Sequence, residues 1–195
     1  MKKLKKNNNF LEKYFSDLSE IIKPNTECLK KLNLVKDLIV STSKKNGKIL
    51  IFGNGGSAAI ASHASVDLTK NARIRAVNFN EADLITCFSN DYGYDRWIEK
   101  TIDFYADKKD IIILISSSGQ SKNMINACKA AKKKRIKVIS FTGHSKNNPL
   151  SKLSMISLWV NSKAYNYIEN IHQIWLLGIC DLIIGKREYS AKRKD

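Results

Sequence analysis

The sequence contains few of the residues that interrupt regular structure, since its 195 residues include only two prolines and nine glycines. It also has no apolar run near the ~20 residues that a membrane-spanning helix requires, because the longest runs cover residues 111–115 and 174–180. These absences exclude collagenous, low-complexity and transmembrane chains, and we expect no membrane partner. With 43% hydrophobic and 27% charged residues, the composition predicts one domain over residues 1–195.

Cysteine is also scarce. Cys28, Cys87, Cys128 and Cys180 are far apart in the sequence and form no Cys-x-x-Cys pair. This spacing excludes a zinc ribbon, and no apolar secretory segment follows the N-terminal lysines. The sequence therefore predicts buried thiols, a reducing compartment and a soluble, cytoplasmic protein.

Negative charge is limited, because 18 Asp and Glu oppose 34 Lys and Arg, for a formal net charge of +16. So basic a chain raises the question of a nucleic-acid partner. The densest run, residues 132–135, ends a predicted helix, where the helix dipole favours cations, and no aromatic residues are interleaved with it. We therefore interpret most of the charge as solvated surface and do not expect a nucleic-acid partner.

The order of apolar segments predicts an α/β fold. Residues 1–45 have apolar residues at helical spacing around a break at Pro24, which predicts an N-terminal helical extension. Short apolar runs then alternate with helical stretches, and such continuously apolar strands indicate parallel crossovers. The predicted class is a three-layer, doubly wound sheet of about five parallel strands flanked by helices. The strands are expected at residues 48–52, 74–79, 110–116, 137–142 and 155–160, and the helices at 57–70, 81–89, 96–105, 121–134 and 164–184.

Two loops at predicted strand ends have the composition of anion-binding sites. The first is Gly53-Asn54-Gly55-Gly56-Ser57, and the second is Ser116-Ser117-Ser118-Gly119-Gln120-Ser121. Glycines let the backbone approach a ligand, and helix N-terminal amides with serine hydroxyls satisfy phosphoryl oxygens. Because ligands of open α/β sheets bind beyond the carboxyl ends of the strands, both loops are expected to line one pocket.

Two alternatives concern the same loops. Gly53, Gly55 and Ala58 fit the loose dinucleotide fingerprint, which requires an acidic residue about 20 positions farther on. Asn78 and Asn80 occupy the end of the second predicted strand instead, so we expect no nucleotide cofactor. Ordinary glycine turns and serine caps are the other alternative.

Taken together, several segments resemble the SIS (sugar isomerase) domain family, and within it the phosphoheptose isomerases. The similar segments are the helical extension, the two loops, residues 90–94 (Asn-Asp-Tyr-Gly-Tyr) and residues 168–172 (Ile-Glu-Asn-Ile-His) in the last helix. The resemblance implies a homotetramer with sites shared between subunits and a sugar phosphate as the small-molecule partner. It also implies that the substrate is contacted by Asn54, Gly55, Gly56, Ser57, Asp91, Ser116, Ser117, Ser118 and Ser121.

The expected catalytic residues depart from the family pattern. Where the isomerases carry a His and, one turn later, a Glu, this chain has His63 and Asp67; where they carry a Gln and a second His, it has Glu169 and Leu177. Asp67 is the candidate base, and His63, Asp67 and Glu169 form the candidate catalytic set and the candidate ligands for zinc or another divalent metal. Surface carboxylates are the alternative for Asp67 and Glu169. His172 is expected to be a hydrogen-bonded structural residue.

The resemblance implies a phosphosugar aldose–ketose isomerase that converts sedoheptulose 7-phosphate to an aldoheptose 7-phosphate. Such a product would feed nucleotide-heptose synthesis and thus lipopolysaccharide or capsule precursors. The reaction requires a base near the carbonyl carbon and an acid or metal that polarises the carbonyl oxygen. Because Leu177 replaces the second His, a non-catalytic phosphosugar-binding regulator or scaffold is the alternative.

Overall fold

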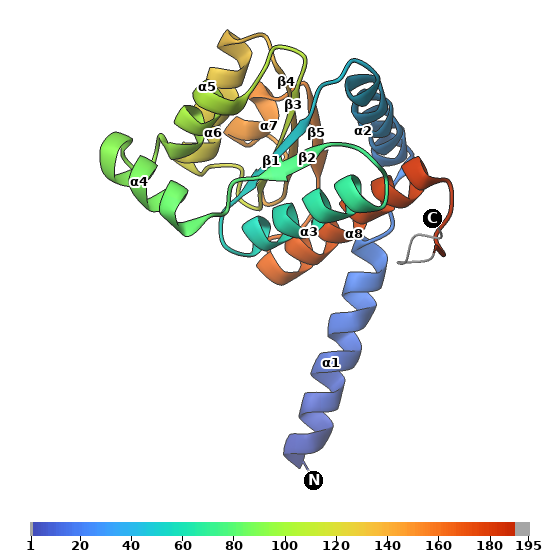
Figure 1. Cartoon of the computed structure of the whole chain (residues 1–195). Coiled ribbons are helices and arrows are strands. Elements are labelled where there is room, and N and C mark those ends of the chain that lie inside the picture. Colours follow the sequence, from blue (N-terminus) through green and yellow to red (C-terminus); the bar gives the residue numbers. More distant parts are fainter. Residues whose placement is uncertain (1, 190–195) are drawn as a thin grey trace.

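The computed structural model describes residues 2–189, with side chains from residue 7 onward. Its centre is a parallel sheet in the order β2-β1-β3-β4-β5 (Figure 1). All neighbouring strands are paired in parallel, which confirms the predicted doubly wound fold. The strands are β1 (Ile49–Gly53), β2 (Ala76–Asn78), β3 (Ile111–Ser116), β4 (Lys137–Thr142) and β5 (Ile156–Trp159).

Helices cover both faces of the sheet because the strands bury alternate side chains on opposite sides. In β1, Ile49 and Ile51 belong to one apolar cluster, whereas Leu50 and Phe52 belong to the other. The first cluster includes residues of α2 (Thr26–Lys44), α3 (Gly56–Lys70) and α8 (Tyr165–Ile184). The second includes residues of α4 (Ala82–Tyr92), α5 (Trp97–Tyr105), α6 (Lys122–Lys133) and α7 (Pro149–Leu153).

Helix α1 (Lys2–Ile21) projects from the body of the protein (Figure 1). Among its described side chains, Leu18 and Ile21 at its C-terminal end pack on the core. The rings of Tyr14 and Tyr167 meet edge to face, with centroids 4.6 Å apart. Farther out, Phe10 is 66% exposed and Phe15 is 62% exposed. The predicted extension is therefore helical, and within one chain it leaves an aromatic surface uncovered.

Two elements differ from the prediction. Strand β2 starts at residue 76 rather than 74, because the Ile74 amide donates to the Leu68 carbonyl at 2.8 Å and closes the end of α3. Helix α7 was not predicted. It follows Asn148, whose side chain accepts from the Ser151 amide at 2.8 Å, and it starts with Pro149, so its capping signal was present in the sequence.

The expectation of buried thiols is correct for two of the four cysteines. Cys128 and Cys180 are buried, whereas Cys28 is half-buried and Cys87 is exposed. Burial raises the pKa of the Cys180 thiol to about 12 and that of Cys28 to about 11. The described cysteines form no disulfide. Among the described helices, none has both the length and the apolar character needed to cross a membrane.

Candidate functional site

The two predicted loops line one cavity at the carboxyl edge of the sheet. Its volume is about 130 Å³. A larger hollow of about 680 Å³ lies at the end of α8, but the serine hydroxyls of the two loops line the smaller cavity. The smaller cavity is lined by Asn54, Ser57, Ile115, Ser116, Ser117, Ser118, Ser121, Tyr165 and Glu169.

The first loop brings backbone close to the cavity. A side chain at Gly53 would place its Cβ 2.2 Å from the Ser57 carbonyl oxygen, so the turn into α3 tolerates only glycine there. Gly55 has a φ of +56°, with open space where a Cβ would lie. Gly55 caps α3 without a side chain, and the Ser57 and Ala58 amides donate to the carbonyls of Asn54 and Gly55 at 3.0 and 2.9 Å. Amides in this position favour an anion.

The second loop holds its hydroxyls with its own backbone. Ser116 Oγ accepts from the Gly119 amide, and Ser118 Oγ accepts from the Gln120 amide, both at 3.2 Å. Gly119 has a φ of +64°, and a Cβ there would collide with the Asn148 side chain. The buried Ser117 hydroxyl has no hydrogen-bond partner among the described residues.

Asn54 is held in place by two residues that the sequence reasoning did not select. Its Nδ2 donates to Asn123 Oδ1 at 3.1 Å, and Asn123 Nδ2 donates back to Asn54 Oδ1 at 2.9 Å. The Tyr94 hydroxyl also donates to Asn54 Oδ1 at 3.1 Å. Asn123 is only 2% exposed, so the pair is fixed from the core side. One Asn54 amide hydrogen stays available to a ligand.

Glu169 reaches the cavity from α8. A Cβ built on Gly56 would lie 2.2 Å from Glu169 Oε2, so the carboxylate lies directly against the start of α3. Negative charge is favourable at a helix N-terminus. As an acceptor in the cavity lining, Glu169 is placed to receive hydrogen bonds from sugar hydroxyls.

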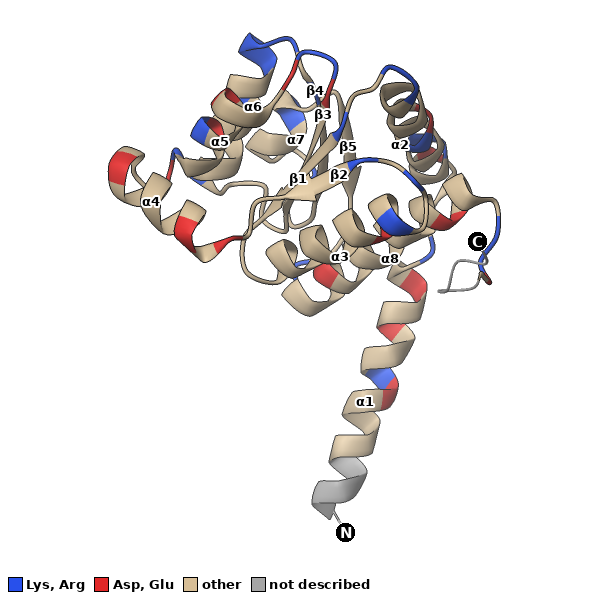
Figure 2. Ribbon diagram, viewed as in Figure 1, with Lys and Arg blue, Asp and Glu red and all other residues tan. Residues whose placement is uncertain are grey.

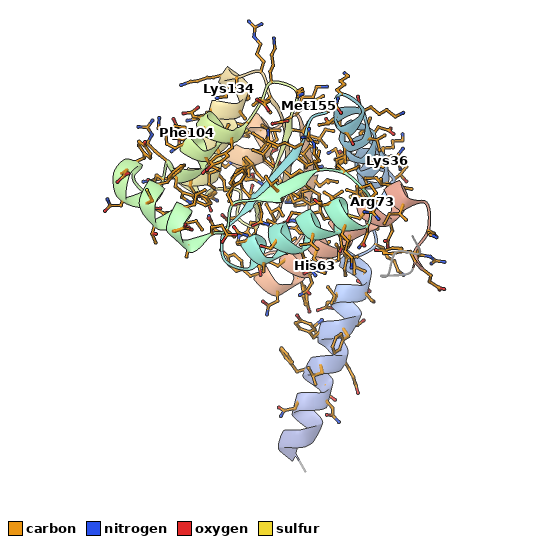
Figure 3. The ribbon with its side chains drawn as sticks, in the orientation of Figure 1. Lys36, His63, Arg73, Phe104, Lys134 and Met155 are labelled. Carbon is orange, nitrogen blue, oxygen red and sulfur yellow. The ribbon has the colours of Figure 1, made fainter. Side chains whose placement is uncertain are left out.

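His63 and Asp67 form a second group on α3. His63 Nε2 lies 3.7 Å from Asp67 Oδ2, and Asn71 Nδ2 donates to Asp67 Oδ1 at 3.1 Å. Gln173 Nε2 on α8 lies 3.0 Å from His63 Nδ1, another contact that the sequence did not indicate. Figure 3 shows His63 on the side of α3 away from the sheet. By the 1.5 Å helical rise, Asp67 is about 15 Å along α3 from Ser57.

Asp91 is not brought to the cavity of its own chain. It is exposed on α4, which lies to one side of the sheet (Figure 1). Its carboxylate accepts from Asn90 Nδ2 at 3.0 Å and lies 3.7 Å from Cys87 Sγ. The sugar contact implied for Asp91 by the resemblance is therefore not formed within one chain.

The three predicted metal ligands do not all lie together in one chain. His63 and Asp67 offer two donors next to each other, whereas Glu169 lies at Gly56, at the start of α3. Across the part of the chain that the structure describes, no three His, Cys, Asp or Glu side chains are grouped for a metal ion. Within the described residues of one chain, His63, Asp67 and Glu169 are therefore not gathered as three ligands of one ion.

His172 has the structural role that was expected. It is fully buried on α8, and its Nε2 lies 3.0 Å from the Thr142 carbonyl oxygen. Burial lowers its pKa to about 4. The ring is therefore neutral near pH 7, and it donates to the backbone beneath the cavity instead of exchanging protons with a ligand.

A comparison with family models matches residues 13–143 to the SIS domain. The chain belongs to the SIS domain family. Curated SIS proteins named phosphoheptose isomerase are similar over most of the length. The Helicobacter pylori protein is 32% identical over 193 residues, covering 94% of this chain and 98% of its own. The Aliarcobacter butzleri protein is 34% identical over 172 residues, covering 85% and 89%.

Solved SIS structures lead to the same grouping. Phosphoheptose isomerase from Neisseria gonorrhoeae superposes with a TM-score of 0.80 at 28% identity, covering 94% of this chain and 99% of its own. The enzyme from Francisella tularensis superposes with a TM-score of 0.82 at 27% identity, covering 95% and 100%. The predicted SIS fold and the similarity to phosphoheptose isomerases are confirmed.

Proposed function

We propose that this SIS domain protein isomerises sedoheptulose 7-phosphate to an aldoheptose 7-phosphate. The observation that carries the proposal is the convergence of both anion loops and a fixed Asn54 on one cavity at the carboxyl edge. The relatives named phosphoheptose isomerase align with nearly the whole chain. The alternative, a regulator without catalysis, is not favoured by these relatives.

In this proposal, the second loop (residues 116–121) binds the phosphate. Ser116, Ser118 and Ser121 present hydroxyls at the start of α6, and Ser57 lies at the start of α3. Two helix N-termini then face the phosphate without a formal positive charge from the protein. Asn54 and Glu169 hydrogen-bond the sugar hydroxyls, which orients the chain of carbons.

Asp67 acts as the base. It removes a proton from C1, an enediol forms, and Asp67 delivers a proton to C2 after partial exchange with solvent. His63, whose Nε2 is next to Asp67, is the group that exchanges a proton with the two oxygens. Asn71 and Gln173 orient these side chains through their contacts with Asp67 and His63.

The distances favour a site shared between subunits. From its phosphorus to C1, the substrate spans roughly 9 Å when extended, from the ~1.2 Å per bond of an extended chain. Asp67 lies about 15 Å along α3 from Ser57 of the same chain. We therefore propose that one copy binds the phosphate and another supplies Asp67, in a homo-oligomer, with a tetramer as the expected state. The exposed Phe10, Phe15 and Ile174 side chains are suited to burial between copies.

We propose a divalent-metal site only between two copies of the chain. His63 and Asp67 of one chain would supply two ligands, and Glu169 of another would supply the third. When bound, such an ion would polarise the carbonyl oxygen of the substrate. The product would serve nucleotide-heptose and surface polysaccharide synthesis in the cytoplasm.

Proton NMR of sedoheptulose 7-phosphate in heavy water with the purified protein tests this proposal. Deuterium should enter next to the carbonyl, aldose signals should appear, and both should vanish in Asp67→Asn. Parallel samples with a chelator and with added zinc show whether turnover depends on a metal. Saturable sugar-phosphate binding with no exchange under either condition would establish the regulator instead.

A further inference from the structure

Basic residues gather at the edge of the sheet opposite the cavity. In a parallel sheet, the segments that precede the strands all lie at one edge, and here the segments before β1, β2, β3 and β4 are rich in lysine and arginine. Figure 2 shows this blue rim across the ends of α2, α3 and α6. We call it the basic edge. It comprises Lys44, Lys45, Lys48, Lys70, Arg73, Arg75, Lys108, Lys109, Lys132, Lys133, Lys134, Arg135 and Lys137.

Most of this charge is open to solvent and not neutralised. Lys48 pairs with Asp107 at 3.0 Å and with Asp110 at 2.6 Å, and Lys134 lies 3.9 Å from Asp103. The other members of the basic edge are exposed, and none forms an ion pair within residues 7–189. A partner would therefore find these cations available.

Helix termini account for only part of the pattern. Lys44, Lys70 and Lys132 end helices, where the dipole favours cations. Arg75, Lys108 and Lys109 lie between helix and strand, and Lys137 opens β4, beyond the last turn in which the dipole acts. Concentrating like charges on one edge opposes folding by mutual repulsion. Favourable helix-dipole interactions therefore account for only some of the cations at the basic edge.

We propose that the basic edge binds the phosphate backbone of a nucleic-acid duplex, without regard to base sequence. Neighbouring strands are about 4.8 Å apart, so their preceding segments present rows of cations to a polymer that carries one charge per ~1.7 Å of axis. This proposal goes against the expectation from the sequence, which weighed residues 132–135 without the three other segments that the fold brings next to them.

The chemistry of these segments selects the type of partner. Residues 44–48, 70–75, 106–110 and 132–137 contain no aromatic side chain, and Ile74 and Ile136 among them are buried. Phe104 and Tyr105, which directly precede residues 106–110, are exposed, but their rings pack against Phe88 and Phe79, with centroids 5.7 and 5.0 Å apart. The segments themselves offer no ring for stacking on single-stranded bases. Beside these segments, Met155 before β5 and the two α5 rings are the exposed large apolar side chains, whereas a lipid surface is entered by a continuous apolar helix face. Contacts to a duplex backbone require neither.

Fluorescence anisotropy with a labelled duplex of about 20 base pairs, titrated from about 50 to 200 mM NaCl, tests this proposal. The basic-edge variant combines Lys132→Gln, Lys133→Gln and Lys137→Gln in the full chain. The control combines Lys122→Gln, Lys146→Gln and Lys163→Gln, which removes the same charge at the carboxyl edge. We expect the basic-edge variant to weaken binding about tenfold or more and to reduce the salt slope by about one for each lysine that contacts phosphate.

The control variant should bind within about twofold of the native protein. If both variants weakened binding equally, the affinity would depend on net charge alone, and the proposal would be overturned. The absence of saturable binding would also overturn it. Stronger binding to anionic lipid vesicles than to the duplex would also overturn it. Circular dichroism of each variant shows that a lost affinity does not come from a lost fold.

Discussion

The cavity lined by the two loops and the His63–Asp67 pair differ in how complete each is within one chain. The cavity has loops, hydroxyls and a fixed Asn54, all supported by buried residues such as Asn123. The pair lies on the outer side of α3, where His63 has a side chain 48% exposed and Asp67 one 21% exposed. Under the proposed function, one folded chain supplies the phosphate cavity, whereas the chemistry depends on what covers the outer face of α3.

Removing the base gives the largest expected effect. Asp67→Asn keeps the shape and the Asn71 contact but cannot accept a proton, so turnover should fall about 1000-fold, within the range of general base catalysis. Sugar-phosphate affinity should stay within about twofold, because the cavity is untouched. Calorimetry and coupled kinetics measure the two quantities. If affinity and turnover fell together, the cavity and the His63–Asp67 pair would form a single site within one chain.

The support beneath the cavity has a pH signature. Burial lowers the pKa of His172 to about 4, compared with about 6.5 in the unfolded chain. The unfolded chain thus binds the extra proton as pH falls, so the stabilisation is full above pH ~6.5 and is lost toward pH ~4. The free energy of unfolding should decrease by up to about 3 kcal/mol from this group.

Urea titrations between pH 7.5 and 4.5 of the native protein and His172→Gln check the pH dependence. The variant should be less stable at neutral pH, with a flatter dependence between about pH 6.5 and 4. Identical slopes in the two proteins would remove His172 as the cause. Isomerase activity at neutral pH should change little in the fraction that stays folded.

Weakening the contacts between copies of the chain should lower turnover but leave sugar-phosphate binding unchanged. Phe10→Ser with Phe15→Ser removes the exposed aromatic surface of α1 and should reduce turnover about thirtyfold at low protein concentration. Sugar-phosphate binding per chain should persist. Light scattering gives the molar mass, and Lys13→Ser with Glu12→Ser on the same helix is the matched control. Full activity in a monomeric variant would contradict a shared site.

The smallest effect concerns the orientation of Asn54. Asn123→Ala removes the paired amide, which should raise KM about tenfold with little change in kcat. Tyr94→Phe removes one hydroxyl from the same acceptor, and its effect should be about threefold. Effects on kcat larger than those on KM would place Asn54 in the chemical step rather than in binding.

Much of the fold was predictable because it depends on local patterns. Continuously apolar runs such as residues 111–115 predict strands buried on both faces, and glycine and serine at their ends predict the ligand loops. Strand β2 was placed too early because the end of α3 uses the Ile74 amide. The predicted loops met at one cavity because parallel strands end at one edge.

The parts that could not be predicted depend on contacts across long stretches of chain. Asn123 and Tyr94 reach Asn54 across 69 and 40 residues, and Gln173 reaches His63 across 110. A single polar residue on a helix gives no periodic signal of such a contact. The basic edge was missed for the same reason, since its segments are separate until the sheet aligns them. The resemblance named His63 and Asp67 correctly as neighbours but could not show their distance from Ser57.

The most direct measurement mixes two inactive variants. One carries Asp67→Asn, and the other carries Ser116→Ala with Ser118→Ala, so each lacks one of the two regions. After unfolding and refolding together, random assembly gives about a quarter of the sites an intact cavity from one chain and an intact Asp67 from another. The account predicts that isomerase activity returns to about that fraction of the native value. Mixed oligomers that form but stay as inactive as either variant alone would show that each site takes both regions from the same chain.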